Sequence, residues 1–177
     1  MKLNENDYFI KDNILFTSKN TQFSNFSTIQ LENLPSDFEK IKALQNQNAQ
    51  LFAICFNFFL IGNEENGFNE AFLADFRDAL KIFDETLTNF VIFPLIENGE
   101  NVATEEIAEI FYHCARRIKD CKAVAGFVLP KSQNNKCEIA IIDALKKKHP
   151  EYIYFVEENS QFEKLNQLYP NRIIVKS

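Results

Sequence analysis

Glycine is scarce in this sequence, with four residues in 177, and tryptophan is absent. A loop that cradles phosphate groups needs closely spaced glycines, and Gly62, Gly67, Gly99 and Gly126 are scattered along the chain. No dinucleotide-binding motif, P-loop or Gly-x-Ser-x-Gly nucleophile motif is present in the sequence. These absences exclude nucleotide binding through a standard glycine-rich loop and the nucleophile turn of α/β-hydrolases.

Histidine and cysteine are also few. A structural zinc site needs four clustered ligands, and no such cluster can be assembled from neighbouring positions. The two histidines are His113 and His149, and the four cysteines, which never form a Cys-x-x-Cys pair, are Cys55, Cys114, Cys121 and Cys137. We interpret the cysteines as core residues with reduced thiols, with a thiol site or a metal site as the alternative.

No segment has the length of a membrane span. The longest apolar run, residues 51–62, is interrupted by Asn57, whereas a spanning helix needs about 20 apolar residues. The N-terminal residues have neither the apolar core nor the cleavage pattern of a secretory signal. We therefore expect a cytoplasmic protein that does not bind a membrane.

Positive charge is in deficit, with a net charge of −6 and a pI near 5.0. Because contacts to phosphate groups need a positive face, this balance argues against a nucleic-acid partner. The basic run 146–149 ends a predicted helix, where it complements the negative end of the helix dipole. Phosphate binding by this run is the alternative interpretation.

From residue 50 onward, apolar runs of strand length alternate with segments of helical periodicity. The expected strands are residues 51–61, 90–96, 123–129, 152–156 and 172–175, and the expected helices are 68–85, 104–119, 135–148 and 160–168. Strands that are apolar at consecutive positions are typical of parallel sheets covered on both faces. We therefore predict an α/β fold with a mainly parallel, helix-covered open sheet of about five strands, in a Rossmann-like or flavodoxin-like three-layer arrangement.

The first 49 residues have a different pattern. Two short apolar runs around Asp12 and Asn13 indicate a β-hairpin, and Ser36-x-x-Glu39 is a capping box that opens a helix. Residues 20–35 give no clear pattern. We predict one domain over 1–177, in which residues 1–49 elaborate the alternating core of 50–177.

The loops that follow the expected strands contain the candidate site. In open parallel sheets, ligands bind outside the carboxyl ends of the strands. Lys131, Ser132 and Asn134 follow one strand and are the predicted contacts for an anionic ligand, whereas Glu64 and Glu97 follow two others and could hold Mg²⁺. Polar loops of this kind also occur in ordinary strand-helix connections, so a purely structural role is the alternative.

Our functional prediction depends on the absence of these catalytic and phosphate-binding motifs. We predict a non-catalytic cytoplasmic interaction or regulatory domain with a protein partner, and a homo-oligomer is left open. The alternative is a small enzyme or sensor that binds a polar, phosphorylated metabolite with Mg²⁺ at the carboxyl edge of the sheet. Neither hypothesis identifies a catalytic residue, and no cofactor other than Mg²⁺ is expected.

Overall fold

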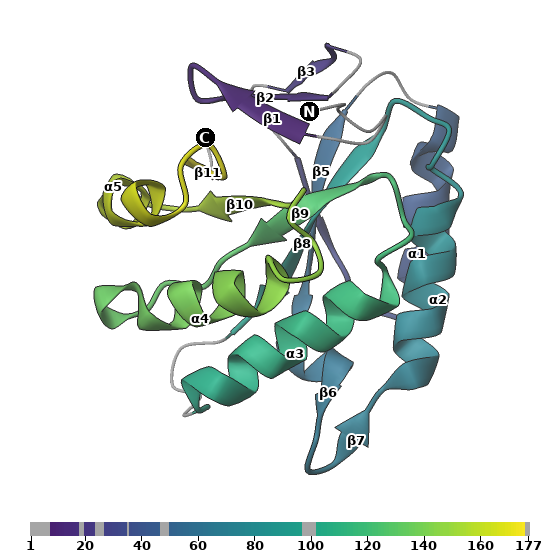
Figure 1. Cartoon of the computed structure of the whole chain (residues 1–177). Helices are drawn as coiled ribbons and strands as arrows, with labels where there is room; N and C mark the ends of the chain where they lie inside the picture. Colours follow the sequence, from purple (N-terminus) through teal and green to yellow (C-terminus); the bar gives the residue numbers. More distant parts are fainter. Residues whose placement is uncertain are drawn as a thin grey trace.

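The structure is a computed structural model that describes residues 8–17, 20–23, 27–34, 36–46, 50–96 and 102–175, apart from the side chains of Asn46 and Asn134. Its main sheet has six strands, all paired in parallel. The strands are β4 (Ser27–Gln30), β5 (Leu51–Asn57), β8 (Asn89–Leu95), β9 (Val124–Val128), β10 (Ile153–Val156) and β11 (Ile173–Val175). They lie side by side in the order in which they occur along the chain (Figure 1).

One helix connects each strand of the main sheet to the next. The helices are α1 (Ser36–Lys42), α2 (Glu70–Lys81), α3 (Thr104–Arg117), α4 (Lys136–Leu145) and α5 (Asn159–Leu168). Their buried side chains share one large core with alternate residues of the strands, such as Ile54, Phe90 and Phe127. The helices therefore cover a single face of the sheet.

A second, smaller sheet covers the opposite face. It consists of β1 (Tyr8–Lys11), β2 (Ile14–Thr17) and β3 (Gln22–Phe23), which pair in antiparallel fashion. Its inward residues Tyr8, Leu15 and Phe23 form a separate apolar cluster with Val91 and Ile153 of the main sheet. The predicted hairpin is thus present, with Asp12 and Asn13 in the positive-φ conformation of its tight turn.

This arrangement confirms the mixed α/β class and the parallel, helix-covered sheet, but the flavodoxin-like three-layer prediction is wrong. In a flavodoxin-like sheet the strand order reverses direction, and the reversal places helices on both faces. Here each strand lies beside the next one in the chain, so right-handed crossovers carry every helix to the same face. The apolar residues on the other face are covered by β1–β3 instead.

The sheet also has one strand more than we expected. β4 lies within residues 20–35, where we find no clear sequence pattern. It is a short, polar edge strand with exposed Ser27, Thr28 and Gln30, so it lacks the apolar alternation that indicates a strand. The predicted strand 51–61 ends earlier, at Asn57. The side-chain oxygen of Asn57 accepts a hydrogen bond from the backbone N–H of Phe59 and starts the 3-10 helix η2 (Phe58–Ile61).

Two short hairpin strands, β6 (Gly62–Asn63) and β7 (Gly67–Phe68), follow η2 and lead into α2. Two further 3-10 helices are η1 (Ala43–Asn46), after α1, and η3 (Gln133–Asn135), before α4. Gly62 has a φ of 81°, and a Cβ atom there would lie 2.4 Å from the carbonyl oxygen of Gly67. This position therefore requires glycine.

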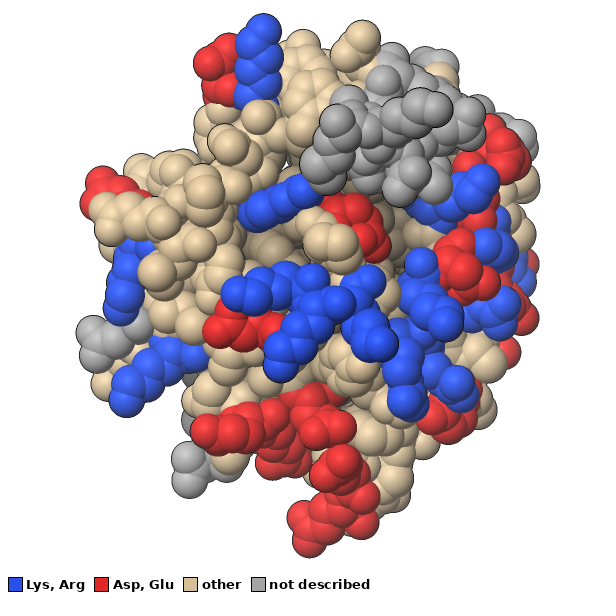
Figure 2. Space-filling view, in the orientation of Figure 1, with Lys and Arg blue, Asp and Glu red and all other residues tan. Residues whose placement is uncertain are grey.

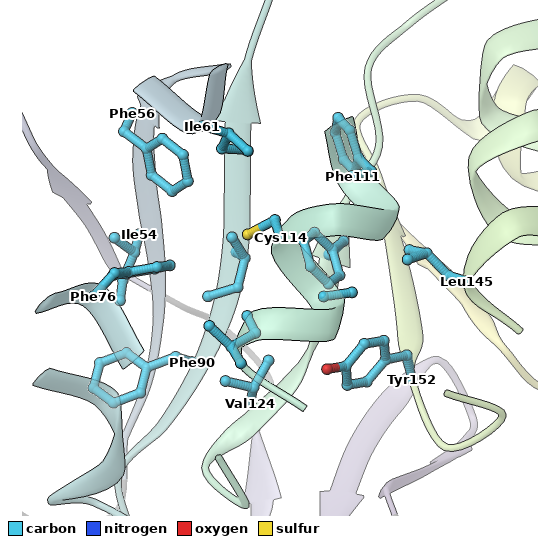
Figure 3. Close-up of a cluster of buried hydrophobic side chains, with 14 of the residues drawn as sticks. Ile54, Phe56, Ile61, Phe76, Phe90, Phe111, Cys114, Val124, Leu145 and Tyr152 are labelled. Carbon is cyan, nitrogen blue, oxygen red and sulfur yellow. The ribbon is translucent and has the colours of Figure 1, made fainter. Parts of the chain in front are cut away.

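Large aromatic and aliphatic side chains fill the space between the main sheet and its helices. Figure 3 shows this core, in which Phe76, Phe90, Phe111 and Cys114 have no solvent exposure. None of the four cysteines forms a disulfide, and all four are buried. Within the described ranges, no helix has the length and apolar character needed to cross a membrane.

Candidate functional site

The carboxyl ends of the six parallel strands open onto one edge of the main sheet, and the connecting helices begin at the same edge. Its loops therefore combine side chains from neighbouring strands with unpaired backbone N–H groups of helix N-termini. In Figure 1 the β6–β7 hairpin projects from this edge, whereas β1–β3 lie at the other end of the molecule. The sequence-based prediction placed a ligand site at this edge.

The most connected polar group at this edge lies between the loops that follow β9 and β10. We call it the β9–β10 rim group, and its members are Lys131, Ser132, Glu138, Glu158 and Gln161. The Nζ atom of Lys131 lies 2.6 Å from Oε1 of Glu158, so this ion pair links the two loops directly.

Glu138 is the buried acid of the group, with no solvent exposure. Its Oε1 accepts hydrogen bonds from the backbone N–H of Ser132 at 3.0 Å and from Nε2 of Gln161 at 2.8 Å. The hydroxyl of Ser132 donates to the other oxygen of Glu138 and accepts from the backbone N–H of Cys137. The donors replace the water that this carboxylate loses on burial, and they hold the loop after β9 against α4 and α5.

Glu158 is the accessible acid of the group, and its side chain is about half exposed. The hydrogen bond and the positive charge of Lys131 hold the pKa of this carboxyl below its usual value. Glu158 is therefore ionised at neutral pH and can accept hydrogen bonds or stabilise positive charge.

Gln161 closes the group on the side of α5. It is buried, and its Nε2 also approaches the carbonyl oxygen of Pro130 at 3.4 Å. Its Oε1 atom has no hydrogen-bond partner in the part of the chain that the structure describes. The group thus retains one buried acceptor.

Only some of the predicted site residues belong to the β9–β10 rim group. Lys131 and Ser132 belong to it, and both make their polar contacts with glutamates. Asn134 lies in η3, and its side chain is outside the described part of the structure. Binding of an anion by these three residues stays a prediction, since it would compete with Glu158 for Lys131.

Of the two predicted Mg²⁺ ligands, the structure describes only Glu64. Glu64 lies in the exposed turn between β6 and β7, and Glu97 lies outside the described residues. Among the described residues, no group of three or more His, Cys, Asp or Glu side chains could hold a metal ion. The proposed coordination by Glu64 and Glu97 therefore also stays a prediction.

Sequence reasoning did not select Glu138, Glu158 or Gln161 as site residues, although the sequence contains a signal for Glu138. Glu138, Ile141, Ile142 and Leu145 are spaced as one face of a helix, and all four are buried. An acid on an apolar helix face indicates a buried polar contact. For Gln161 we find no comparable signal, because its side-chain partners lie in α4 and in the loop after β9, which are distant from it in sequence.

His113 has a structural environment rather than a catalytic one. It is buried on α3, its ring stacks on Phe68 with centroids 3.6 Å apart, and its Nε2 lies 3.0 Å from Oε1 of Glu70. Burial lowers the pKa of this imidazole, and the hydrogen bond to Glu70 opposes that shift. His113 therefore fixes β7 and the start of α2 against α3.

Comparisons with known proteins add information on the fold. No family model and no curated protein sequence matches the chain. Solved structures do match: the catalytic domain of a mannanase from Streptomyces sp. SirexAA-E has a TM-score of 0.70 at 11% identity, over 98% of this chain and 62% of the mannanase chain. A β-mannanase from Thermomonospora fusca gives 0.68 at 10% identity, over 96% and 63% of the two chains.

An endoglucanase from Pseudomonas stutzeri, in complex with cellobiose, is also similar. Its TM-score is 0.63 at 14% identity, over 96% of this chain and 61% of the endoglucanase chain. This chain thus spans somewhat more than three-fifths of the length of these barrel-like glycoside hydrolases. At such identities the likeness shows the fold alone.

This likeness corrects our functional prediction. The hypothesis of a non-catalytic interaction or regulatory domain relied on the absence of familiar catalytic motifs, and it is wrong because the fold is shared with catalytic domains of glycoside hydrolases. Such enzymes need two carboxylates rather than a glycine-rich loop, a histidine or a nucleophile turn. The absences noted in the sequence therefore do not argue against catalysis.

Proposed function

We propose that this chain is a carbohydrate-active domain that binds and hydrolyses a glucan or mannan at the carboxyl edge of its parallel sheet. The observation that supports this proposal is the sheet itself. Its strands follow one another in chain order with all helices on one face, as in the mannanase and endoglucanase structures. A closed barrel of this type has eight strands and has its active site at the carboxyl ends of those strands.

The β9–β10 rim group is the proposed site on this edge. Glycoside hydrolysis uses two carboxyl groups, of which one donates a proton and the other, ionised, acts as nucleophile or base. Glu138, at the start of α4, and Glu158, in the loop after β10, supply the two carboxyl groups. Glu158 is proposed as the ionised group, because Lys131 holds its pKa low.

Glu138 is the candidate for the second carboxyl group. Since it is fully buried, a substrate reaches it only after the loop that carries Ser132 moves away from it. The free Oε1 of Gln161 would then accept a hydrogen bond from a sugar hydroxyl. A neutral sugar rather than an anion suits this group, because the group has two acidic side chains and one lysine, and the lysine is already paired with Glu158.

The test is hydrolysis of soluble glucan and mannan, measured as newly formed reducing ends. Glu158→Gln keeps the size of the side chain and removes its charge, so the rate should fall at least about 100-fold. The matched control is Glu163→Gln on the exposed face of α5, which should leave the rate unchanged. Lys131→Ala should move the acidic limb of the pH-rate profile to higher pH, because the pKa of Glu158 would rise.

Two results would overturn parts of this proposal separately. If the folded protein neither cleaves nor binds either polysaccharide, the carbohydrate-active function is wrong. If it cleaves one of them and Glu158→Gln has full activity, the function stands and the β9–β10 rim group is not its site.

A further inference from the structure

α3 carries an exposed stripe of side chains whose charge changes sign along the helix. Glu105, Glu109, Tyr112 and Arg116 are spaced by four, three and four residues, so they lie on one face. That face points away from the core, since the buried residues of α3 lie elsewhere around the helix. Lys119 follows just beyond the end of the helix and is also exposed.

The charges of this stripe have no ion-pair partner within the described residues. Charged side chains near the stripe but outside it form two ion pairs, Arg117 with Glu70 and Arg77 with Asp120. Arg116 has a hydrogen-bonding contact with the ring nitrogen of His113, at 3.4 Å. Among the described residues, none carries a charge that neutralises Glu105, Glu109, Arg116 or Lys119 through an ion pair.

The helix dipole explains only part of the pattern. It favours acids in the first turn and bases in the last turn, which accounts for Glu105 and Arg116. Glu109 lies beyond the first turn and repels Glu105 four residues earlier. The stripe is therefore not the arrangement that best stabilises an isolated helix.

Figure 2 shows the same separation over a wider area. Acidic side chains gather over the N-terminal part of α3 and the β6–β7 hairpin, and basic side chains gather over the C-terminal ends of α3 and α4. Both areas lie on the helix-bearing face that is turned toward the viewer. A single flat partner could therefore cover the two areas together.

We propose that this face binds a second copy of the chain, with the two α3 helices antiparallel across a twofold axis at Tyr112. In this register Glu109 faces Arg116 of the second copy, and Glu105 faces its Lys119. The twofold axis repeats both pairs, which makes one stripe complementary to itself. Tyr112 lies at the centre, half-buried against the core, and offers its remaining surface to its counterpart.

Such a dimer depends on salt, because exposed ion pairs are individually weak and are screened by counterions. Sedimentation velocity of the full chain should show a concentration-dependent dimer at low ionic strength that dissociates at high ionic strength. Glu109→Arg or Arg116→Glu alone places like charges opposite each other twice. Either change should raise the dimer dissociation constant at least about tenfold.

The double variant Glu109→Arg/Arg116→Glu is the decisive measurement. It reverses both members of the pair, so self-complementarity returns and the dimer should re-form, although each single change removes it. Asp75→Arg on the exposed face of α2 changes the net charge as Glu109→Arg does and should leave the dimer intact. Circular dichroism confirms that each variant is folded.

Three outcomes would overturn the proposal. They are a wild-type chain that stays monomeric at low ionic strength, a dimer that either single reversal leaves intact, and a double variant that remains monomeric. None of these outcomes depends on whether the chain cleaves a polysaccharide.

Discussion

Burial changes the chemistry of the cysteines at the scale of single residues. It raises the pKa of Cys114, Cys121 and Cys137 to about 12, against about 8.5 for a free cysteine. The thiolate is the form that attacks a thiol reagent. At neutral pH these three residues are therefore protected both by the surrounding side chains and by their protonation.

We predict that the folded protein reacts slowly with a disulfide reagent at pH 7 and that its rate is still rising at pH 9, because thiols with a pKa of about 12 are far from fully ionised there. The denatured chain should react quickly and show four reactive thiols, because none of the four cysteines forms a disulfide. Its rate should rise with pH until about 8.5, as expected for exposed thiols. Time courses of reagent absorbance with and without denaturant measure both rates.

A fast phase from the folded protein would contradict this prediction, since it would show an accessible thiolate. Fewer than four thiols after denaturation without reductant would instead reveal a disulfide. That second result would contradict the reduced cysteines expected from the sequence.

At the scale of single residues, the sequence alone predicted only part of the candidate site. Lys131 and Ser132 were identified because they follow an apolar run, and both lie in the β9–β10 rim group. Glu158 could not be assigned as the partner of Lys131, because no local pattern shows that the loop after β10 meets the loop after β9. Contacts between loops depend on strand order, which a single sequence does not encode in its periodicity.

At the scale of secondary-structure elements, the close approach of β9 and β10 depends on Gly126. This residue pairs with Ile153, and a Cβ atom built on it would lie 1.8 Å from the carbonyl oxygen of Ile153. The backbone of β10 would have to move to accommodate any side chain. β9 and β10 support the rim group, so this contact also determines the geometry of the candidate site.

We predict that Gly126→Ala lowers the free energy of unfolding by more than about 4 kcal/mol, which is beyond the usual range for one substitution. Gly67→Ala is the matched control. Gly67 has a φ of 84° but no atom within 4 Å of its missing Cβ, so only backbone strain of about 1–2 kcal/mol is expected. Urea unfolding followed by circular dichroism measures both values.

Equal losses for the two variants would contradict the steric argument and would attribute the effect to backbone conformation alone. If Gly126→Ala is too unstable to purify, thermal unfolding of Gly126→Ala and Gly67→Ala in cell lysate provides the same comparison. A stable Gly126→Ala protein would show that β9 and β10 are farther apart than the structure places them.

The sequence predicted the elements more reliably than their arrangement. Helices and strands after residue 50 follow from local periodicity, and four of the five expected strands differ from β8–β11 by at most one residue at each end. The exception is the run after Asn57, where a side-chain cap converts an apolar segment into η2. β4 was missed because an exposed, polar edge strand has no apolar alternation to detect.

At the scale of the whole molecule, two apolar clusters hold the layers together. The larger cluster lies between the main sheet and its helices, and the smaller one lies between the main sheet and β1–β3. The sequence could not distinguish this arrangement from a sheet with helices on both faces, because a strand covered on both faces is apolar at consecutive positions in either case. The smaller cluster is therefore the feature that separates this fold from the one we expected.

The last prediction tests whether β1–β3 cover the main sheet as a docked layer. Leu15 is fully buried in the smaller cluster, and Tyr8 anchors the same layer through its hydroxyl, which donates to Oδ1 of Asn89 at 2.5 Å. Leu15→Asp places a carboxylate among apolar side chains, which costs several kcal/mol unless the layer separates from the sheet. We expect a lower urea midpoint and strong binding of a fluorescent apolar dye, with helical circular dichroism retained in the absence of denaturant. Lys11→Asp, an exposed change on the same hairpin, should neither lower the urea midpoint nor increase dye binding. If Leu15→Asp behaves like this control, β1–β3 do not protect the main sheet.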